Sequence, residues 1–289
     1  MKKPTFRVVI TLILSLSISV VFADGQETPQ SQKDRKDAER IWEQAIAAKG
    51  GRSNLHTIHS LSVTTTSHNS NDERKFQDLQ VTEFFLLPDK VWSWIDQRPG
   101  FPLTVRQYDF QSEIGYEIDE RTSYVERPEK ETSIDRRLNS ILFDGSRFND
   151  YMKSKFFENQ MIYLMETKWF HPDITGMRIE GRGKKKVAII EAAFGRKKFE
   201  YYLDAATNLP KKITITTWFE SLKTSDSNDF YLSDYVEING VKFPQNVSLG
   251  SGDESRTTYL VNPPYNKNLF KQQPSLTAGP DAWKAKEPK

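Results

Sequence analysis

The sequence predicts an α+β protein in which one curved antiparallel sheet of about 10 to 12 strands wraps around helices. Segments with apolar residues at every second position recur from Ile58 onwards, which is typical of strands with one buried face. They follow one another too closely for the crossovers that parallel pairing needs. Two stretches depart from this period, one near the N-terminus and one in mid-chain, and both indicate helices.

The first helix is predicted over residues 37–49, because the apolar side chains of this stretch lie on one helical face. Asp37 suits the N-cap, and Gly50-Gly51 ends the helix, since glycine adopts the left-handed conformation without penalty. We expect this helix to pack on the sheet. Its apolar residues are Ile41, Trp42, Ala45, Ile46 and Ala48.

Period-two alternation predicts strands over most of the remaining chain. Pro88-Asp89 marks the turn of one hairpin and Ile238-Asn239-Gly240 the turn of another. Pro244 has no amide donor, so it indicates a sheet edge or a bulge. The predicted strands are residues 61–66, 76–87, 91–95, 103–110, 177–181, 187–193, 198–203, 211–219, 229–237, 241–249 and 256–261, with shorter ones near 116–119 and 122–126.

Residues 134–168 interrupt the alternation. A helix is predicted over residues 134–143, with Ser133 as its cap, and a longer one over residues 147–167 after the break at Asp144-Gly145. The longer helix is rich in Met and Phe. It is either an ordinary amphipathic core helix or an adaptable surface for an apolar ligand.

The N-terminus has the pattern of a cleaved secretory signal peptide over residues 1–23. Basic residues precede an uncharged apolar run over residues 8–21, and Val21-Phe22-Ala23 suits cleavage before Asp24. The alternative is an uncleaved membrane anchor, but the run is shorter than the roughly 20 residues that a bilayer span needs. The expected organisation is this signal peptide, a flexible lead-in over residues 24–36, a single domain over residues 37–265 and a polar tail over residues 266–289.

Charge and cysteine content narrow the class of protein. Three of the 41 basic residues and none of the 39 acidic ones lie in residues 1–23, so the remaining chain has 38 basic and 39 acidic residues. This balance does not support a nucleic-acid-binding protein. The chain has no cysteine, which excludes disulfides, a thiol nucleophile and lipid attachment through an N-terminal cysteine. We expect a periplasmic protein without a lipid anchor.

Phrases spread over most of the chain carry a family resemblance. They are Ala47-Ala48-Lys49-Gly50-Gly51 with Leu55 and Ile58-His59-Ser60-Leu61, Leu87-Pro88-Asp89-Lys90-Val91, Tyr201-Tyr202-Leu203-Asp204-Ala205-Ala206-Thr207-Asn208-Leu209-Pro210, Ser233-Asp234-Tyr235-Val236-Glu237-Ile238-Asn239-Gly240-Val241-Lys242-Phe243-Pro244 and Asn262-Pro263-Pro264-Tyr265. They resemble the LolA/LolB-like superfamily of bacterial outer-membrane lipoprotein-sorting proteins. The resemblance implies an unclosed β-barrel with helices on its concave side and a hollow that binds the acyl chains of lipoproteins.

An apolar site for lipidated or hydrophobic cargo is expected on the concave side, because burial of each methylene contributes about 0.8 kcal/mol. The alternation puts Phe84 and Leu86 on one face, with Val91 and Ile95 across the turn. The expected lining residues are Phe84, Leu86, Val91, Ile95, Ile213, Ile215, Phe243 and Val247. Two alternatives stay open: an ordinary dry core, and a lining formed by the opposite face, to which we assign Phe85, Trp92 and Trp94.

Basic residues concentrate between positions 178 and 212, where ten basic side chains accompany four acidic ones. The hairpin tip near residue 184 and Lys211-Lys212 are expected at the same end of the sheet. Contact with anionic head groups or a membrane surface is one interpretation, and solvated turns that protect a sheet edge are the other. The expected contact residues are Lys184, Lys185, Lys186, Lys211 and Lys212.

Motifs of catalysis or metal binding are not found in the sequence. His56 and His59 are three residues apart, but His68 and His171 lie elsewhere and no zinc pattern joins them. No nucleophile elbow or nucleotide-binding loop occurs. We therefore expect a periplasmic, non-enzymatic binder or carrier of lipidated cargo, without cofactor or metal and with transient membrane contact. The alternatives are an envelope sensor or protein-interaction domain on the same scaffold and, with less support, an envelope hydrolase.

Overall fold

A computed structural model describes the greater part of the chain. The described residues are 29–68, 79–97, 102–112, 114–119, 123–126, 133–134, 145–183, 186–195, 197–219, 223–249 and 254–285. The predicted signal peptide and most of the predicted helix over residues 134–143 lie outside them.

The helices are α1 (Pro29–Lys49), α2 (Arg52–Leu55) and α3 (Gly145–Tyr163), with 3-10 turns η2 (Leu269–Lys271) and η3 (Leu276–Ala278) near the C-terminus. Helix α1 begins within the segment that we expected to be a flexible lead-in. Pro29 is tolerated in a first helical turn, and the following residues contain no glycine. Residues 33–36 are exposed, so this first part shows no apolar period and escapes a pattern search.

The fold class is confirmed as antiparallel α+β. One sheet has the order β14-β1-β2-β3-β4-β5-β6-β7 and the other the order β13-β12-β11-β10-β9-β8. The strands of the first are β1 (Ser60–His68), β2 (Leu79–Leu86), β3 (Lys90–Asp96), β4 (Thr104–Asp109), β5 (Ile114–Asp119), β6 (Ser123–Glu126), β7 (Ser133–Ile134) and β14 (Glu254–Val261). The strands of the second are β8 (Asp173–Glu180), β9 (Val187–Phe194), β10 (Lys197–Leu203), β11 (Pro210–Phe219), β12 (Thr224–Ile238) and β13 (Val241–Leu249).

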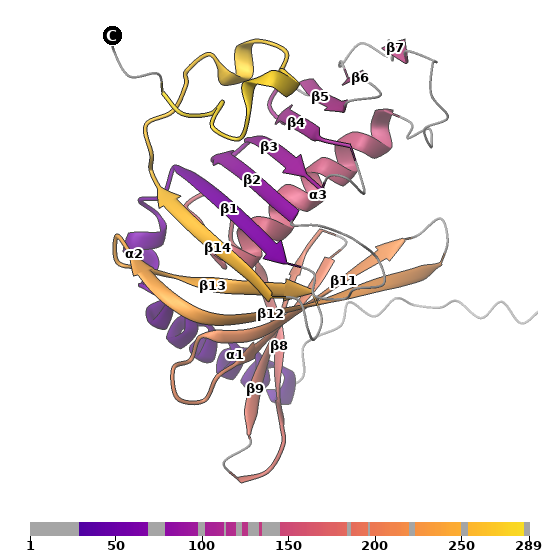
Figure 1. The fold of residues 1–289 in the computed structure, drawn as a ribbon. Helices are drawn as coiled ribbons and strands as arrows, with labels where there is room; N and C mark the ends of the chain where they lie inside the picture. Colours follow the sequence, from indigo (N-terminus) through magenta and orange to yellow (C-terminus); the bar gives the residue numbers. More distant parts are fainter. Residues whose placement is uncertain are drawn as a thin grey trace, which may run out of the picture.

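Two sheets replace the single curved sheet that we expected, and β7 occupies the first residue of the predicted helix over 134–143. The sheets meet where β14 crosses β13 (Figure 1). Tyr259 of β14 donates a hydrogen bond to the carbonyl oxygen of Pro244 in β13. Pro244 itself pairs with Tyr235 of β12 and lies in a strand at the edge of its sheet, as its missing amide donor predicts.

The register of the β2–β3 hairpin decides which side chains share a face. Phe84 lies opposite Trp92, and Phe85 lies opposite Val91. Directly opposed residues of an antiparallel pair point to the same side. The predicted face that joined Phe84 to Val91 is therefore wrong, and so is the assignment of Trp92 to the face of Phe85.

The length of the turn explains this error. A two-residue turn at Pro88-Asp89 would pair Leu86 with Val91, whereas the observed three-residue turn pairs Leu86 with Lys90. A shift of one residue moves every side chain of a strand to the opposite face. Phe84 and Leu86 thus face away from Val91 and Ile95.

In the described part of the chain two apolar cores result, one on each face of the first sheet. The inner core lies between the two sheets, α1 and α3, and it includes Phe85 and Val91. The outer core lies on the other face of β2, β3 and β4, and it includes Phe84, Trp92 and Trp94.

A C-terminal strap, residues 262–285, covers the outer core (Figure 1). The Trp283 ring stacks on Phe84 with centroids 5.1 Å apart and planes at 6°. Leu269 and Trp283 are buried, and the side chain of Gln107 donates to the carbonyl oxygen of Gln272 at 3.0 Å. The packed body therefore extends past position 265, where we expected a polar tail to begin.

Candidate functional site

Helix α3 lies between the two sheets and fills the concave side of the molecule (Figure 1). Phe156 contacts Phe85 of β2, with ring centroids 5.9 Å apart. Phe157 contacts Phe194 of β9, with centroids 4.5 Å apart. The two neighbouring phenylalanines thus reach opposite sheets, and aromatic side chains occupy the space between them.

Polar contacts anchor α3 to the first sheet. The side-chain amide of Asn159 donates to both carboxylate oxygens of Glu83 in β2, at 3.0 and 3.1 Å. Burial raises the pKa of Glu83 to about 7, although the charges of Arg106 and Lys155 and the bond from Asn159 act in the opposite direction. A carboxyl group in this position changes its charge near neutral pH.

A second polar contact anchors α3 to the other sheet. Glu158 forms a buried ion pair with Lys197 of β10, which also donates to the hydroxyl of Thr217 at 3.2 Å. Burial lowers the pKa of Lys197, and the charge of Glu158 opposes that shift. Because removing two charges from water offsets most of their attraction, such a pair holds a helix less firmly than apolar packing of the same size.

Most of the predicted cargo-lining residues belong to the inner core. Ile213, Ile215 and Phe243 are fully buried there, and Val91 and Val247 pack with them. Ile95 lies opposite Val81, on the face of Phe85. Phe84 belongs instead to the outer core beneath the C-terminal strap, and Leu86 packs against that core.

Lys49 is a buried cation that the sequence analysis did not single out. Lys49 is the last residue of α1 and is 1% exposed. The ammonium lies 5.4 Å from the ring centroid of Tyr235 and 5.2 Å from that of Phe243. Burial lowers its pKa from 10.5 to about 7. Two aromatic faces and the C-terminal end of a helix both favour a positive charge and offset part of this effect.

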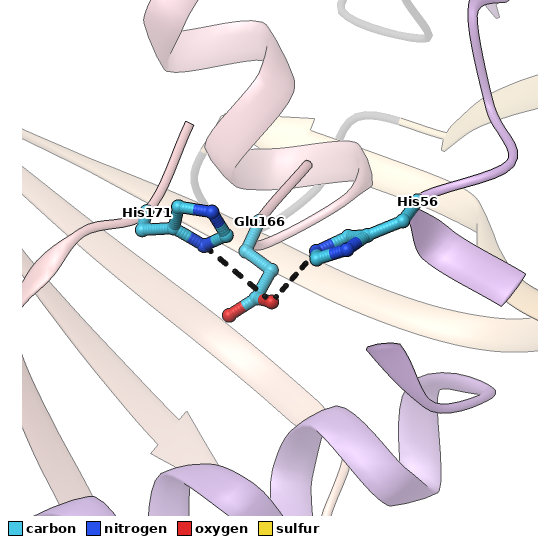
Figure 2. Close-up of side chains that lie close together, drawn as sticks. All are labelled: His56, Glu166 and His171. Atoms are coloured by element: carbon cyan, nitrogen blue, oxygen red, sulfur yellow. Dashed lines mark hydrogen bonds and ion pairs between the residues drawn. The ribbon is translucent and has the colours of Figure 1, made fainter. Parts of the chain in front are cut away.

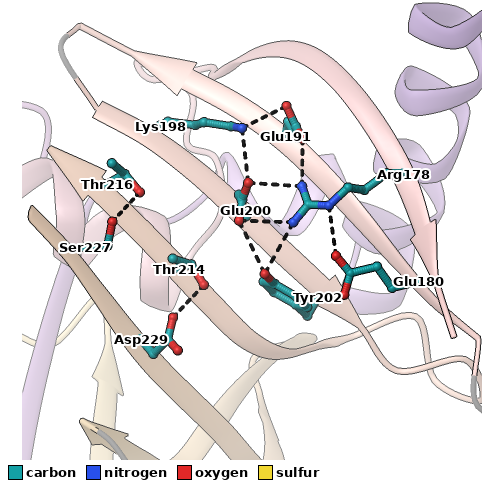
Figure 3. A network of polar contacts seen from close by, with 10 residues as sticks. All are labelled: Arg178, Glu180, Glu191, Lys198, Glu200, Tyr202, Thr214, Thr216, Ser227 and Asp229. Carbon is teal, nitrogen blue, oxygen red and sulfur yellow. Dashed lines mark hydrogen bonds and ion pairs between the residues drawn. The ribbon is translucent and has the colours of Figure 1, made fainter. Parts of the chain in front are cut away.

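Carboxylates pair with part of the basic region between positions 178 and 212. On the outward face of the second sheet, Arg178 binds Glu191 and Glu200 through Nη1, at 2.7 and 3.0 Å (Figure 3). Lys198 lies 3.0 and 3.1 Å from the same two carboxylates. The hydrogen bonds of Arg178 to Glu200, Glu180 and Glu191 raise its pKa, so these charges are paired on the surface of the sheet.

Lys211 and Lys212 lie near the β8–β9 hairpin at one end of the second sheet, as expected. Lys186 and Lys211 are exposed, while Lys212 lies 3.0 Å from Asp229 and 4.3 Å from the ring centroid of Tyr202. Lys184 and Lys185 lie outside the described residues. A surface pocket of about 410 Å³ opens here, lined by Glu180, Gly181, Val187, Tyr202, Lys211, Lys212 and Tyr231.

A cluster of two histidines and a glutamate lies at the end of α3 (Figure 2). His56 Nε2 lies 3.2 Å from Glu166 Oε1, and His171 Nδ1 lies 3.7 Å from the same oxygen. The two imidazole rings meet edge to face, with centroids 5.5 Å apart. The sequence analysis missed this cluster because 110 residues separate His56 from Glu166.

Glu166 is held firmly in this cluster. Its side chain is 1% exposed, and Arg52 binds both carboxylate oxygens while also binding Glu43. Burial raises the pKa of Glu166, but the hydrogen bonds from Arg52, His56 and Trp42 outweigh burial and lower it overall. Glu166 is therefore an ionised carboxylate at neutral pH, with its orientation set by its neighbours.

None of the helices in the described part of the chain is long and apolar enough to cross a membrane.

Comparison with known proteins gives structural likeness alone. No family model matches the chain, and no curated protein matches its sequence. A LolA superfamily protein from Nitrosomonas europaea aligns with 77% of this chain and 91% of its own, at 13% identity and a TM-score of 0.37. A putative outer-membrane lipoprotein-sorting protein domain from Vibrio parahaemolyticus aligns with 83% of this chain and 97% of its own, at 12% identity and the same TM-score. LprF from Mycobacterium bovis aligns with 78% of this chain and 92% of its own, at 12% identity and a TM-score of 0.24.

The first of these structures is a LolA superfamily protein and the second a putative outer-membrane lipoprotein-sorting domain, which are the terms of the resemblance in the sequence phrases. At these identities and TM-scores the likeness carries no inference about function.

Proposed function

We propose that this protein is a periplasmic, non-enzymatic binder or carrier of lipidated or otherwise hydrophobic cargo, and that acyl chains occupy the space of α3 between the two sheets. The observation that carries the proposal is the combination of an apolar concave face with a helix across it that is anchored in part by polar contacts. Ile213, Ile215 and Phe243 supply part of that face. Asn159 and Glu158 supply the polar anchors.

The energetics favour exchange of α3 for acyl chains. Burial contributes about 0.8 kcal/mol per methylene, so a chain of about 15 methylenes supplies on the order of 12 kcal/mol before other terms. This gain opposes the cost of exposing the apolar side chains of α3, which include Phe156, Phe157, Met161, Ile162 and Tyr163. The ion pair between Glu158 and Lys197 opposes the exchange less than apolar packing of the same size would, because both charges regain water when they separate.

We propose that Lys186, Lys211 and Lys212, together with Lys184 and Lys185, contact anionic head groups transiently. Each lysine near an anionic surface contributes about 1 kcal/mol. Lys212 contributes less than the exposed lysines, because Asp229 already neutralises it.

A covalent lock on α3 tests the proposal. The chain has no cysteine, so Glu83→Cys with Asn159→Cys introduces the only two thiols, at side chains that already touch. A short bis-maleimide then ties α3 to β2, and binding of a fluorescent long-chain fatty acid is titrated before and after cross-linking. We expect the linked protein to lose at least about tenfold in affinity, the equivalent of 1.4 kcal/mol.

Two controls separate the lock from the chemistry of cross-linking. The same variant capped with N-ethylmaleimide should keep its affinity. On the outward face, Lys198 Nζ lies 3.0 Å from Glu191 Oε2. A cross-link between cysteines at these two positions should leave uptake unchanged. Unaltered binding by the locked protein would refute a cargo site beneath α3. Native mass spectrometry of protein purified from its own host tests the carrier function as a whole. Protein that carries no lipid and takes up no added fatty acid would count against that function.

A further inference from the structure

We propose that His56, Glu166 and His171 form a binding site for a divalent transition-metal ion of the zinc type. The three side chains come from two separate parts of the chain, the end of α2 and the segment that follows α3 (Figure 2). The proposal stands on their geometry and donor chemistry, and it is independent of the proposed cargo binding.

The donor atoms are spaced for a common ion. Zinc lies about 2.0 to 2.1 Å from imidazole nitrogen and carboxylate oxygen, so tetrahedral donors are roughly 3.3 Å from one another. His56 Nε2 and His171 Nδ1 lie 3.2 and 3.7 Å from Glu166 Oε1, and each of the three residues offers a ligand atom within 4.8 Å of those of the other two. His171 has to move closer to Glu166 than 3.7 Å, and its side chain, which is 54% exposed, leaves room for that adjustment.

The neighbours of Glu166 hold its carboxylate by hydrogen bonds, as is typical of residues that bind a metal. Arg52 Nη2 donates to Glu166 Oε2 at 3.0 Å, and a bond from Trp42 adds to this support. Such contacts fix the orientation of a ligating carboxylate. Glu166 Oε1 accepts from Arg52 Nε, and an ion would take the place of its contact with His56 Nε2, because a carboxylate oxygen has two lone pairs.

The local charge also suits a cation. Arg52 is bound by two carboxylates, since its Nη1 and Nη2 each lie 2.9 Å from an oxygen of Glu43. One guanidinium between Glu43 and Glu166 leaves a formal charge of −1 beside two imidazoles, which attracts a cation. The positive charge of Arg52 is thus matched within the cluster and does not exclude an ion.

The donor set indicates which ions bind. Two imidazole nitrogens and one carboxylate oxygen match the preferences of zinc and its neighbours, whereas calcium and magnesium prefer oxygen ligands. Three protein ligands leave a fourth position for water. A bound ion would join α2 to the segment after α3 and so fix that end of the helix.

Titration of the full-length chain with zinc chloride, after removal of metal with a chelator, tests the site. Isothermal calorimetry should show one saturable zinc ion per chain, and neither calcium nor magnesium should replace it. His56→Ala and His171→Ala should each weaken zinc binding by more than about tenfold. Loss of a residue that only supports a ligand already costs about tenfold in metal affinity, and these two residues are the ligands themselves. Zinc should also raise the Tm of the unaltered chain but not of these two variants.

His59→Ala is the matched control, because His59 lies three residues from His56, is exposed, and is not part of the cluster. It should bind zinc like the unaltered chain. The proposal is overturned if no saturable binding occurs, if both cluster variants bind zinc with unchanged affinity, or if His59→Ala weakens binding as much as they do. Far-ultraviolet circular dichroism of each variant shows whether weaker zinc binding comes from the missing side chain or from unfolding. Because His171 is exposed, His171→Ala should disturb the fold least.

Discussion

Lys49 makes stability depend on pH in a direction that can be measured. Burial lowers the pKa of its ammonium from 10.5 to about 7 in the folded protein. One pKa unit corresponds to about 1.36 kcal/mol, so below pH 7, where both folded and unfolded chains hold the proton, the buried charge costs up to about 5 kcal/mol. Between pH 7 and 10.5 the unfolded chain binds a proton that the folded chain has released, so this cost shrinks as the pH rises.

Lys49→Met keeps the apolar stem and removes the charge. We expect it to raise the free energy of unfolding by several kcal/mol at about pH 6, with the gain falling towards zero above the unfolded-state pKa. Urea unfolding followed by tryptophan fluorescence at a series of pH values measures the gain. Lys211→Met, at an exposed lysine, is the control and should show no such trend. A gain that does not change with pH, or a loss at every pH, would refute the account of Lys49 as a charge buried without adequate compensation.

Three further perturbations follow from the packing. Trp283→Ala removes a 2% exposed ring stacked on Phe84, and we expect a loss of about 3 kcal/mol in urea unfolding together with faster proteolysis of the C-terminal strap. Gly50→Ala puts a methyl group 2.1 Å from the carbonyl oxygen of Gly240 at a residue with φ 131°, so the Tm should fall steeply. Glu83 has a folded-state pKa raised from 4.5 to about 7, so the folded protein binds the extra proton and loses stability as the pH rises through that window. Glu83→Gln should abolish this decline, which amounts to up to about 3 kcal/mol, in unfolding measured from acidic to neutral pH.

Local sequence patterns predicted most of the strands because side-chain alternation survives in any sheet. The strand over residues 241–249 coincides with β13, and the turn at Asn239-Gly240 joins it to β12. Both turn residues have positive φ, which Asn and Gly adopt readily. The hairpin at Pro88 was located equally well, yet its faces were assigned wrongly, because one additional turn residue inverts the register and alternation does not report turn length.

Contacts between distant segments escaped the sequence analysis for a different reason. Trp283 sits in a polar stretch and has no apolar period around it, but Phe84 gives it a stacking partner about 200 positions earlier in the chain. Glu166 is one of 39 acidic residues, and nothing near it in sequence marks it as the partner of His56. In both cases the partner is defined by chain folding and leaves no local signal.

By itself the sequence determined the fold class, the positions of most elements and the apolar character of the strands that surround α3, because these follow from periodicity, glycine and proline. Tertiary structure alone decided which face of each strand is inner, what covers the outer face, and that two histidines meet one buried carboxylate. Those outcomes depend on strand register and on packing between residues far apart in the chain, and both are set by the folded molecule as a whole.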